Sequence, residues 1–172
     1  RIVTERDKKI TAYHEAGHAV CTYYCPHQDR VHQISIIPRG MAGGYTMSLP
    51  EHDKSYVSMM EMREEIVTLL GGRVAEKLIL DDISTGASGD IQQASSIARA
   101  MVTKYGMSDR LGPISFDDSS SSVFIGRDFS QKKSYSEQTA AIIDEEVKDI
   151  FDRAQAKCTD ILNEHRELLI AV

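Results

Sequence analysis

The sequence has few cysteines, no long apolar run and no concentration of basic charge. Its three cysteines are an odd and sparse set, which excludes a disulfide framework and favours a reducing compartment. No apolar stretch is long enough to span a bilayer, and no signal peptide opens the chain. The 20 Lys and Arg residues form no dense cluster and the net charge is −6, so nucleic acid and anionic membrane surfaces are not expected as main partners.

The remaining composition is typical of a globular protein. Hydrophobic residues make up 41% of the sequence, and 172 residues can form one sizeable core or two small subdomains. Cys21 and Cys25 are four residues apart, but on an apolar helix face such cysteines are expected to pack rather than to bind metal. The first residue is Arg1 rather than Met, so we expect the chain to be part of a longer protein.

Periodicity and turn residues predict a mainly helical chain with a small sheet. The pattern predicts helices over residues 4–25, 55–80, 90–105 and 136–172, and strands over 31–37 and 43–50. Pro26 ends the first helix, and the glycines and Pro50 that bound the second strand mark it as an edge strand. Regularity fades between residues 106 and 135, where the low-complexity stretch 117–122 is expected to be a mobile loop.

Two adjacent glycines, Gly71 and Gly72, lie inside the helix that is predicted over residues 55–80. Each costs about 1 kcal/mol relative to alanine in a helix interior. Such a pair usually indicates that another backbone comes close, so we expect a tight helix contact at this point.

The stretch TAYHEAGHAV contains two histidines four residues apart, with a glutamate directly after the first. Four-residue spacing places His14 and His18 on one helix face, so both imidazoles can bind a single ion. Zinc accepts two such nitrogens and leaves room for a third protein ligand and a water. Glu15 is then placed to take a proton from that water and to pass it to a leaving amine.

A solvated helix face is the non-catalytic explanation of the same residues. Against it, Ala12, Ala19 and Val20 make the helix apolar nearly all round. A buried helix does not carry two histidines and a glutamate without partners, and a shared metal ion would supply one.

A third metal ligand is required, and the residues alone leave two alternatives open. No histidine falls in the short window after His18 where a third histidine ligand would be expected, and His27 and His32 do not fit. The acidic candidates are Glu76 in GGRVAEKLI and Asp90 in GASGDIQQAS. Glu76 could equally be an exposed ion-pair former on its helix, and Asp90 could equally be a helix N-cap.

Five stretches, in the same order along the chain, resemble one known family. They are TAYHEAGHAV, VHQISIIPRGMAGGYT, GGRVAEKLI, STGASGDIQQASSIARAMVTKYGMSDRLGP and YSEQTAAIIDEEVKDIF. Together they resemble the protease domain of the FtsH-type, membrane-anchored, ATP-dependent zinc metalloproteases, from Thr4 to about Leu169. The resemblance implies a mainly helical zinc-peptidase fold with a small β-sheet and the HExxH pattern on a core helix.

Roles for single residues follow from this resemblance. It implies that His14, His18 and Asp90 bind one Zn²⁺ per chain and that Glu15 is the general base. Glu76 then becomes a candidate for orienting a ligand histidine or supporting the helix.

The resemblance also implies a larger assembly. In the family, a hexameric ring carries an AAA ATPase module that precedes the peptidase and threads unfolded polypeptide towards it. That module uses the ATP, and this sequence has no G-x-x-x-x-G-K-[ST] with which to bind it. The full-length protein is expected at the cytoplasmic face of a bacterial inner membrane, attached through segments outside this sequence. Its expected substrates are unfolded or misassembled membrane and cytosolic proteins.

Within the chain, we expect the catalytic helix and sheet at about residues 1–110 and a C-terminal helical part at about 111–172. Gly44, Tyr45, Thr46 and Met47 lie on the predicted edge strand, where an extended substrate could pair with free backbone groups. Two other functions compete with the peptidase. One is a ring-assembly domain with a structural or inactive metal site, against which the presence of Glu15 counts. The other is a thermolysin-like enzyme that uses Glu76 as ligand.

Overall fold

The computed structural model describes residues 2–36, 45–49, 56–116 and 135–172. Its elements are α1 (Glu5–Tyr23), β1 (Arg30–Ser35), β2 (Tyr45–Leu49), α2 (Met59–Leu80), the 3₁₀ turn η1 (Thr85–Ala87), α3 (Ser88–Thr103), α4 (Glu137–Glu164) and α5 (Arg166–Ala171). The predicted class, mainly helical with a small sheet, is confirmed. No helix in these described ranges is both long and apolar enough to cross a membrane.

Side-chain caps explain where three of the helices begin. Thr4 caps α1 in a reciprocal box, in which its hydroxyl accepts from the Asp7 amide at 3.1 Å and the Asp7 carboxylate accepts from the Thr4 amide. At α2 and α4 the cap is a single hydrogen bond, in which the Ser58 hydroxyl accepts from the Glu61 amide and the Ser136 hydroxyl accepts from the Thr139 amide. The N-cap of α3 is Ala87, which makes no side-chain cap, so Asp90 is a first-turn residue and not the cap.

The single helix that the pattern predicts over residues 136–172 is wrong. The chain leaves helical geometry at His165 (φ −115°, ψ 34°), and the short helix α5 follows. The His165 ring stacks on Tyr24, with ring centroids 3.6 Å apart and planes 5° from parallel. The turn lets α5 pack against α1 and bury Leu169 in the core. The helix break at His165 thus coincides with stacking on Tyr24, and the spacing of apolar residues along the helix does not indicate it.

The sheet consists of β1 and β2, paired antiparallel. The register joins Ser35 to Tyr45 and Gln33 to Met47, with an irregularity between Val31 and Gln33. In the described part of the chain each strand has one partner, which agrees with the predicted edge strand. Gly44, the turn at 38–40 and the stretch 117–122 lie outside the described residues.

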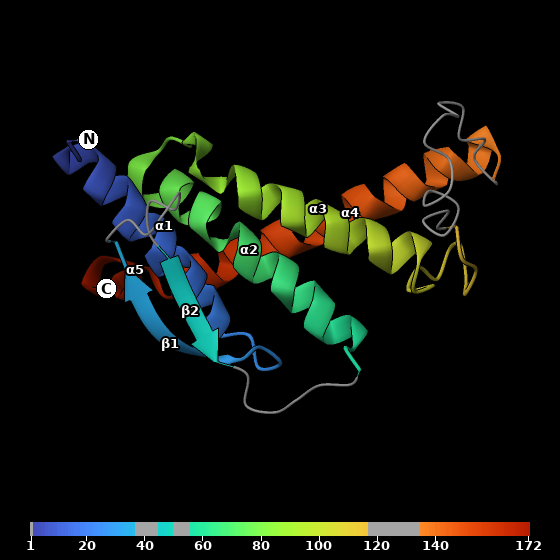
Figure 1. Cartoon of the computed structure of the whole chain (residues 1–172), viewed down its shortest axis with the longest axis horizontal. Coiled ribbons are helices and arrows are strands. Elements are labelled where there is room, and N and C mark those ends of the chain that lie inside the picture. Colours follow the sequence, from blue (N-terminus) through green and yellow to red (C-terminus); the bar gives the residue numbers. More distant parts are fainter. Residues whose placement is uncertain (1, 37–44, 50–55, 117–134) are drawn as a thin grey trace.

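The core is built around α2, which packs against α1, α3 and α4 (Figure 1). Its largest buried side chains include Ile66, Met101, Ile143 and Leu162. The three cysteines also lie in this core as free thiols, and burial raises the pKa of Cys25 to about 12. Although the predicted boundary near residue 110 falls between α3 and α4, α4 shares one core with the other helices.

The backbones of α1 and α2 touch where glycines face each other. A Cβ atom on Gly17 would lie 2.2 Å from the Gly71 carbonyl oxygen and 2.6 Å from the Ala75 Cβ. A Cβ atom on Gly71 would lie 2.7 Å from the Gly17 carbonyl oxygen. The tight contact that the glycine pair predicts is therefore present, and it holds α2 directly against the HEAGH segment.

We expect Gly17→Ala to lower the free energy of unfolding by about 1–3 kcal/mol, because the added methyl group has backbone on its far side and cannot be accommodated without separating the helices. Urea unfolding followed by circular dichroism would measure this. Gly89→Ala is the matched control, since nothing lies within 4 Å of a Cβ atom there. Equal stability of the two variants would contradict the proposed crossing.

Candidate metal centre

Three side chains from two helices meet at one point. His14 and His18 project from α1, and Asp90 projects from the first turn of α3. The two Nε2 atoms are 2.9 Å apart, and each lies 3.1 Å from Oδ2 of Asp90. Across the described residues, this is the only group of three or more His, Cys, Asp or Glu whose ligand atoms lie within 4.8 Å of one another.

The spacing of these three atoms suits a small tetrahedral ion. Ligand atoms bound to zinc at 2.0–2.1 Å lie about 3.3 Å apart around a tetrahedron. The observed triangle, with edges of 2.9–3.1 Å, is close to that size. Two nitrogens and one carboxylate oxygen, with a side left open, are also the donor set of catalytic zinc sites.

Hydrogen bonds at the far side of each imidazole determine which nitrogen faces the cluster centre. Nδ1 of His18 lies 2.7 Å from the carbonyl oxygen of Thr68, which can only accept, so Nδ1 carries the proton and donates it. Nδ1 of His14 donates in the same way to Oε2 of Glu76 at 2.8 Å. In the neutral rings both Nε2 atoms then present lone pairs towards each other, an arrangement that a cation would stabilise.

The electrostatics of the cluster favour positive charge at its centre. Burial lowers the pKa of His14, but its hydrogen bonds with Asp90 and Glu76 outweigh this and raise it to about 8. For Asp90 the directions are reversed. Burial raises the pKa of this carboxyl group, but its hydrogen bonds with the two histidines hold that pKa well below the usual range. The same balance that retains a proton would attract a divalent cation.

Glu76 lies behind His14 rather than beside the three converging atoms. It is 1% exposed, and its second oxygen accepts from the Ser84 amide at 3.2 Å. Because both its oxygens are engaged away from the Nε2 atoms, Glu76 is neither an exposed ion-pair former nor placed as a ligand in this arrangement. The structure brings Asp90 to the cluster in its stead, and the role of each residue stays a prediction.

The other predicted site residues lie nearby or elsewhere. Glu15 follows His14 on α1 and is 7% exposed. Tyr45, Thr46 and Met47 belong to β2, which packs beside α1 (Figure 1). His27 is not part of the cluster, because its amide and its Nδ1 both donate to Oε2 of the buried Glu64. Sequence reasoning missed Thr68, since a backbone carbonyl leaves no signal in residue type.

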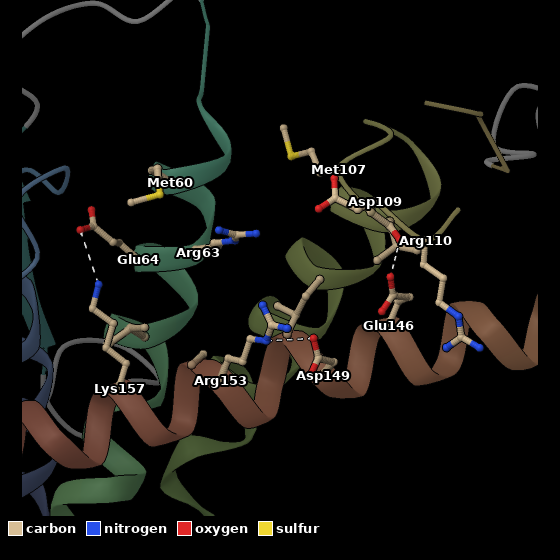
Figure 2. Close-up of a pocket in the computed structure, with 15 residues that line it drawn as sticks. Met60, Arg63, Glu64, Met107, Asp109, Arg110, Glu146, Asp149, Arg153 and Lys157 are labelled. Carbon is tan, nitrogen blue, oxygen red and sulfur yellow. Dashed lines mark hydrogen bonds and ion pairs between the residues drawn. The ribbon is translucent and has the colours of Figure 1, made fainter. Parts of the chain in front are cut away.

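A cavity of about 430 Å³ lies between α2, α4 and the residues that follow α3, and no residue of the cluster lines it. Figure 2 shows its charged walls, with Arg153 paired to Asp149 and Lys157 pointing to Glu64. These two ion pairs join four of the eight charged side chains that line the cavity. The donor set of the metal cluster, rather than the size of a cavity, identifies the candidate site.

Comparison with known proteins finds a matching family and several close relatives. Residues 1–172 match peptidase family M41. An ATP-dependent zinc metalloprotease FtsH 2 of Alkaliphilus metalliredigens is 57% identical over 98% of this chain and 24% of its own length. An ATP-dependent zinc metalloprotease FtsH of Caldicellulosiruptor bescii is 56% identical over 98% of this chain and 27% of its own. The chain spans about a quarter of the length of these relatives.

We expect Asp90→Ala to lower the zinc affinity of the purified chain by more than Glu76→Ala does, because Asp90 would contact the ion and Glu76 acts through His14. Each loss should reach at least about 10-fold. Competition with a chromophoric chelator would measure the affinities, and circular dichroism would check folding.

Asp160→Ala, at an exposed position of α4, is the control and should bind zinc normally. Zinc retained by Asp90→Ala but lost from Glu76→Ala would reverse the two roles and support the thermolysin-like alternative.

Proposed function

We propose that this chain, which belongs to peptidase family M41, is the zinc endopeptidase unit of an ATP-dependent metalloprotease. The observation that carries the proposal is the convergence of two Nε2 atoms and one carboxylate oxygen beside Glu15 on a buried HEAGH helix. Zinc fits this donor set, and the printed names of the relatives include the same metal.

In the proposed mechanism, His14 and His18 would hold the ion through Nε2 and Asp90 would hold it through Oδ2. When bound, the ion lowers the pKa of a water molecule and polarises the carbonyl of the scissile peptide bond. Glu15 removes a proton from the water as it attacks and delivers that proton to the leaving amine. Glu15 is 7% exposed, which limits the access of bulk solvent to this residue.

Glu76 and Thr68 would hold the two ligand rings in place. Their oxygens accept from the Nδ1 atoms of His14 and His18 at 2.8 and 2.7 Å. Such partners fix the tautomer and the ring orientation and make the opposite nitrogen a better donor to metal. Glu76 is itself held by the Ser84 amide, so the support extends to the turn before α3.

The strand β2 is the proposed binding edge for substrate backbone. In the described structure it pairs on one side with β1, and its residues Tyr45, Thr46 and Met47 lie on an element that contacts α1. An extended polypeptide could pair with the other side, with Gly44 continuing the same segment outside the described residues. Recognition through backbone groups suits an enzyme that cleaves many unfolded sequences.

The remaining expectations concern the full-length protein. We infer an ATPase module outside this chain, a hexameric ring and attachment to the cytoplasmic face of a bacterial inner membrane, as in the FtsH-type proteases that the sequence resembles. ATP would be consumed by that module, and unfolded or misassembled proteins would be its substrates. The identity to proteins named ATP-dependent zinc metalloproteases supports this inference.

Glu15→Gln should leave zinc bound and stop hydrolysis, because the amide cannot accept the proton of the attacking water. Loss of a general base costs about 10²–10⁴-fold in rate. Cleavage of an internally quenched peptide and of casein, together with zinc content by elemental analysis, would measure both effects.

The matched control is Glu5→Gln at the exposed start of the same helix, which should keep full activity. A Glu15→Gln protein that still cleaves peptide at the parental rate would remove the general-base assignment. A parent protein that holds zinc and is inert would favour the ring-assembly alternative.

A further inference from the structure

Three residues of α2, each four residues after the last, face the two candidate metal ligands of α1. Thr68, Gly72 and Glu76 lie on this face, opposite His14 and His18. The carbonyl oxygen of Thr68 accepts from His18, and the carboxylate of Glu76 accepts from His14. Gly72 lies between these two contacts, and its own contact is steric.

Because Gly72 has no side chain, the His14 ring can occupy the space beside it. A Cβ atom on Gly72 would lie 2.5 Å from Cε1 and Nε2 of His14 and 2.6 Å from Nδ1. Because the three ring atoms are almost equally distant, the Cβ atom would sit over the face of the imidazole. The ring therefore lies flat against the backbone of α2 at this residue.

The neighbouring glycine has a different contact. The three atoms nearest to a Cβ atom on Gly71 would be the oxygen and carbon of the Gly17 carbonyl group, at 2.7 and 3.0 Å, and Sγ of Cys21 at 3.1 Å. Gly71 thus permits the close approach of two backbones, whereas Gly72 permits the position of one side chain. Of these two adjacent glycines, Gly71 is therefore needed for the packing of the helices and Gly72 for the position of a candidate metal ligand.

We propose that Gly72 is a positioning residue of the metal centre, which holds the His14 ring where Nε2 reaches the ion while Nδ1 stays bonded to Glu76. The inference rests on the proposed zinc site. Carbon atoms in contact prefer separations of about 3.5–4.0 Å, so a methyl group at residue 72 would push the ring by roughly 1 Å. The ring is the free end of a side chain and moves more easily than a helix, so the displacement falls on the ligand atom.

This assignment predicts that Gly72→Ala weakens metal binding more than it lowers stability. Glycine is unfavourable in a helix interior relative to alanine, so Gly72→Ala removes a local cost from α2. The displaced ring, in contrast, loses its alignment with Asp90 and Glu76. A residue needed only for packing would lower stability on substitution and leave the intrinsic metal affinity of the folded protein unchanged.

The test compares Gly72→Ala with Gly71→Ala in the full chain, with Gly89→Ala as a neutral helix control. Zinc affinity is measured by chelator competition, ligand geometry by the visible absorption of the Co²⁺-substituted protein, and stability by urea unfolding in excess chelator. Gly72→Ala should lose about 10- to 100-fold in zinc affinity and change the Co²⁺ spectrum, while its unfolding midpoint falls by less than that of Gly71→Ala. Gly71→Ala should unfold at lower urea while its folded fraction keeps the parental affinity and spectrum.

Parental zinc affinity and Co²⁺ spectrum in Gly72→Ala would overturn the assignment, with the zinc site itself left intact. Equal losses of stability in the two variants, with parental affinity in their folded fractions, would reduce Gly72 to a packing residue and also overturn it. If the parent protein binds neither Zn²⁺ nor Co²⁺, the proposed function is contradicted, and the role of Gly72 is contradicted with it.

Discussion

The direct contact between α1 and α2 positions both the core and the candidate metal ligands. Gly17 and Gly71 let the two backbones touch, and side chains of ordinary size at either residue would separate them. At this separation an oxygen of Thr68 and an oxygen of Glu76 reach the rings of the two histidines. The packing of the core and the orientation of the metal ligands are therefore consequences of the same interface.

The polar side chains in this interface are buried, so each of them needs a hydrogen-bond or ionic partner. His14, Glu15 and Glu76 are each less than a tenth exposed, and an unpaired charge in such surroundings is strongly destabilising. The carboxylates of Asp90 and Glu76 are directed at the imidazoles, and the pKa of His14 is raised to about 8 as a result. A divalent ion would satisfy the same converging groups at once. Metal binding and the stability of the folded chain are expected to be linked for that reason.

Much of the helical framework could be predicted from the sequence, because helix periodicity, proline and capping residues act locally. The strands and the first three helices fall close to their predicted ranges, and α4 begins within one residue of its predicted start. The break at His165 could not be predicted, since the apolar pattern continues through it and the stacking partner Tyr24 is distant in sequence. The start of α3 was misplaced by two residues, because Ala87 provides no capping side chain to mark it.

Helix geometry converts a spacing of four residues into a shared face, so the order of residues was enough to pair His14 with His18 and to place Glu15 next to His14. It left Glu76 and Asp90 unresolved as partners, and it did not distinguish Gly71 from Gly72. Only the tertiary structure separated these, because Glu76 and Asp90 lie 62 and 76 residues from His14 and meet it through packing. Local spacing is set by covalent geometry and backbone hydrogen bonds, whereas contacts over such separations are set by which faces of the helices are buried together.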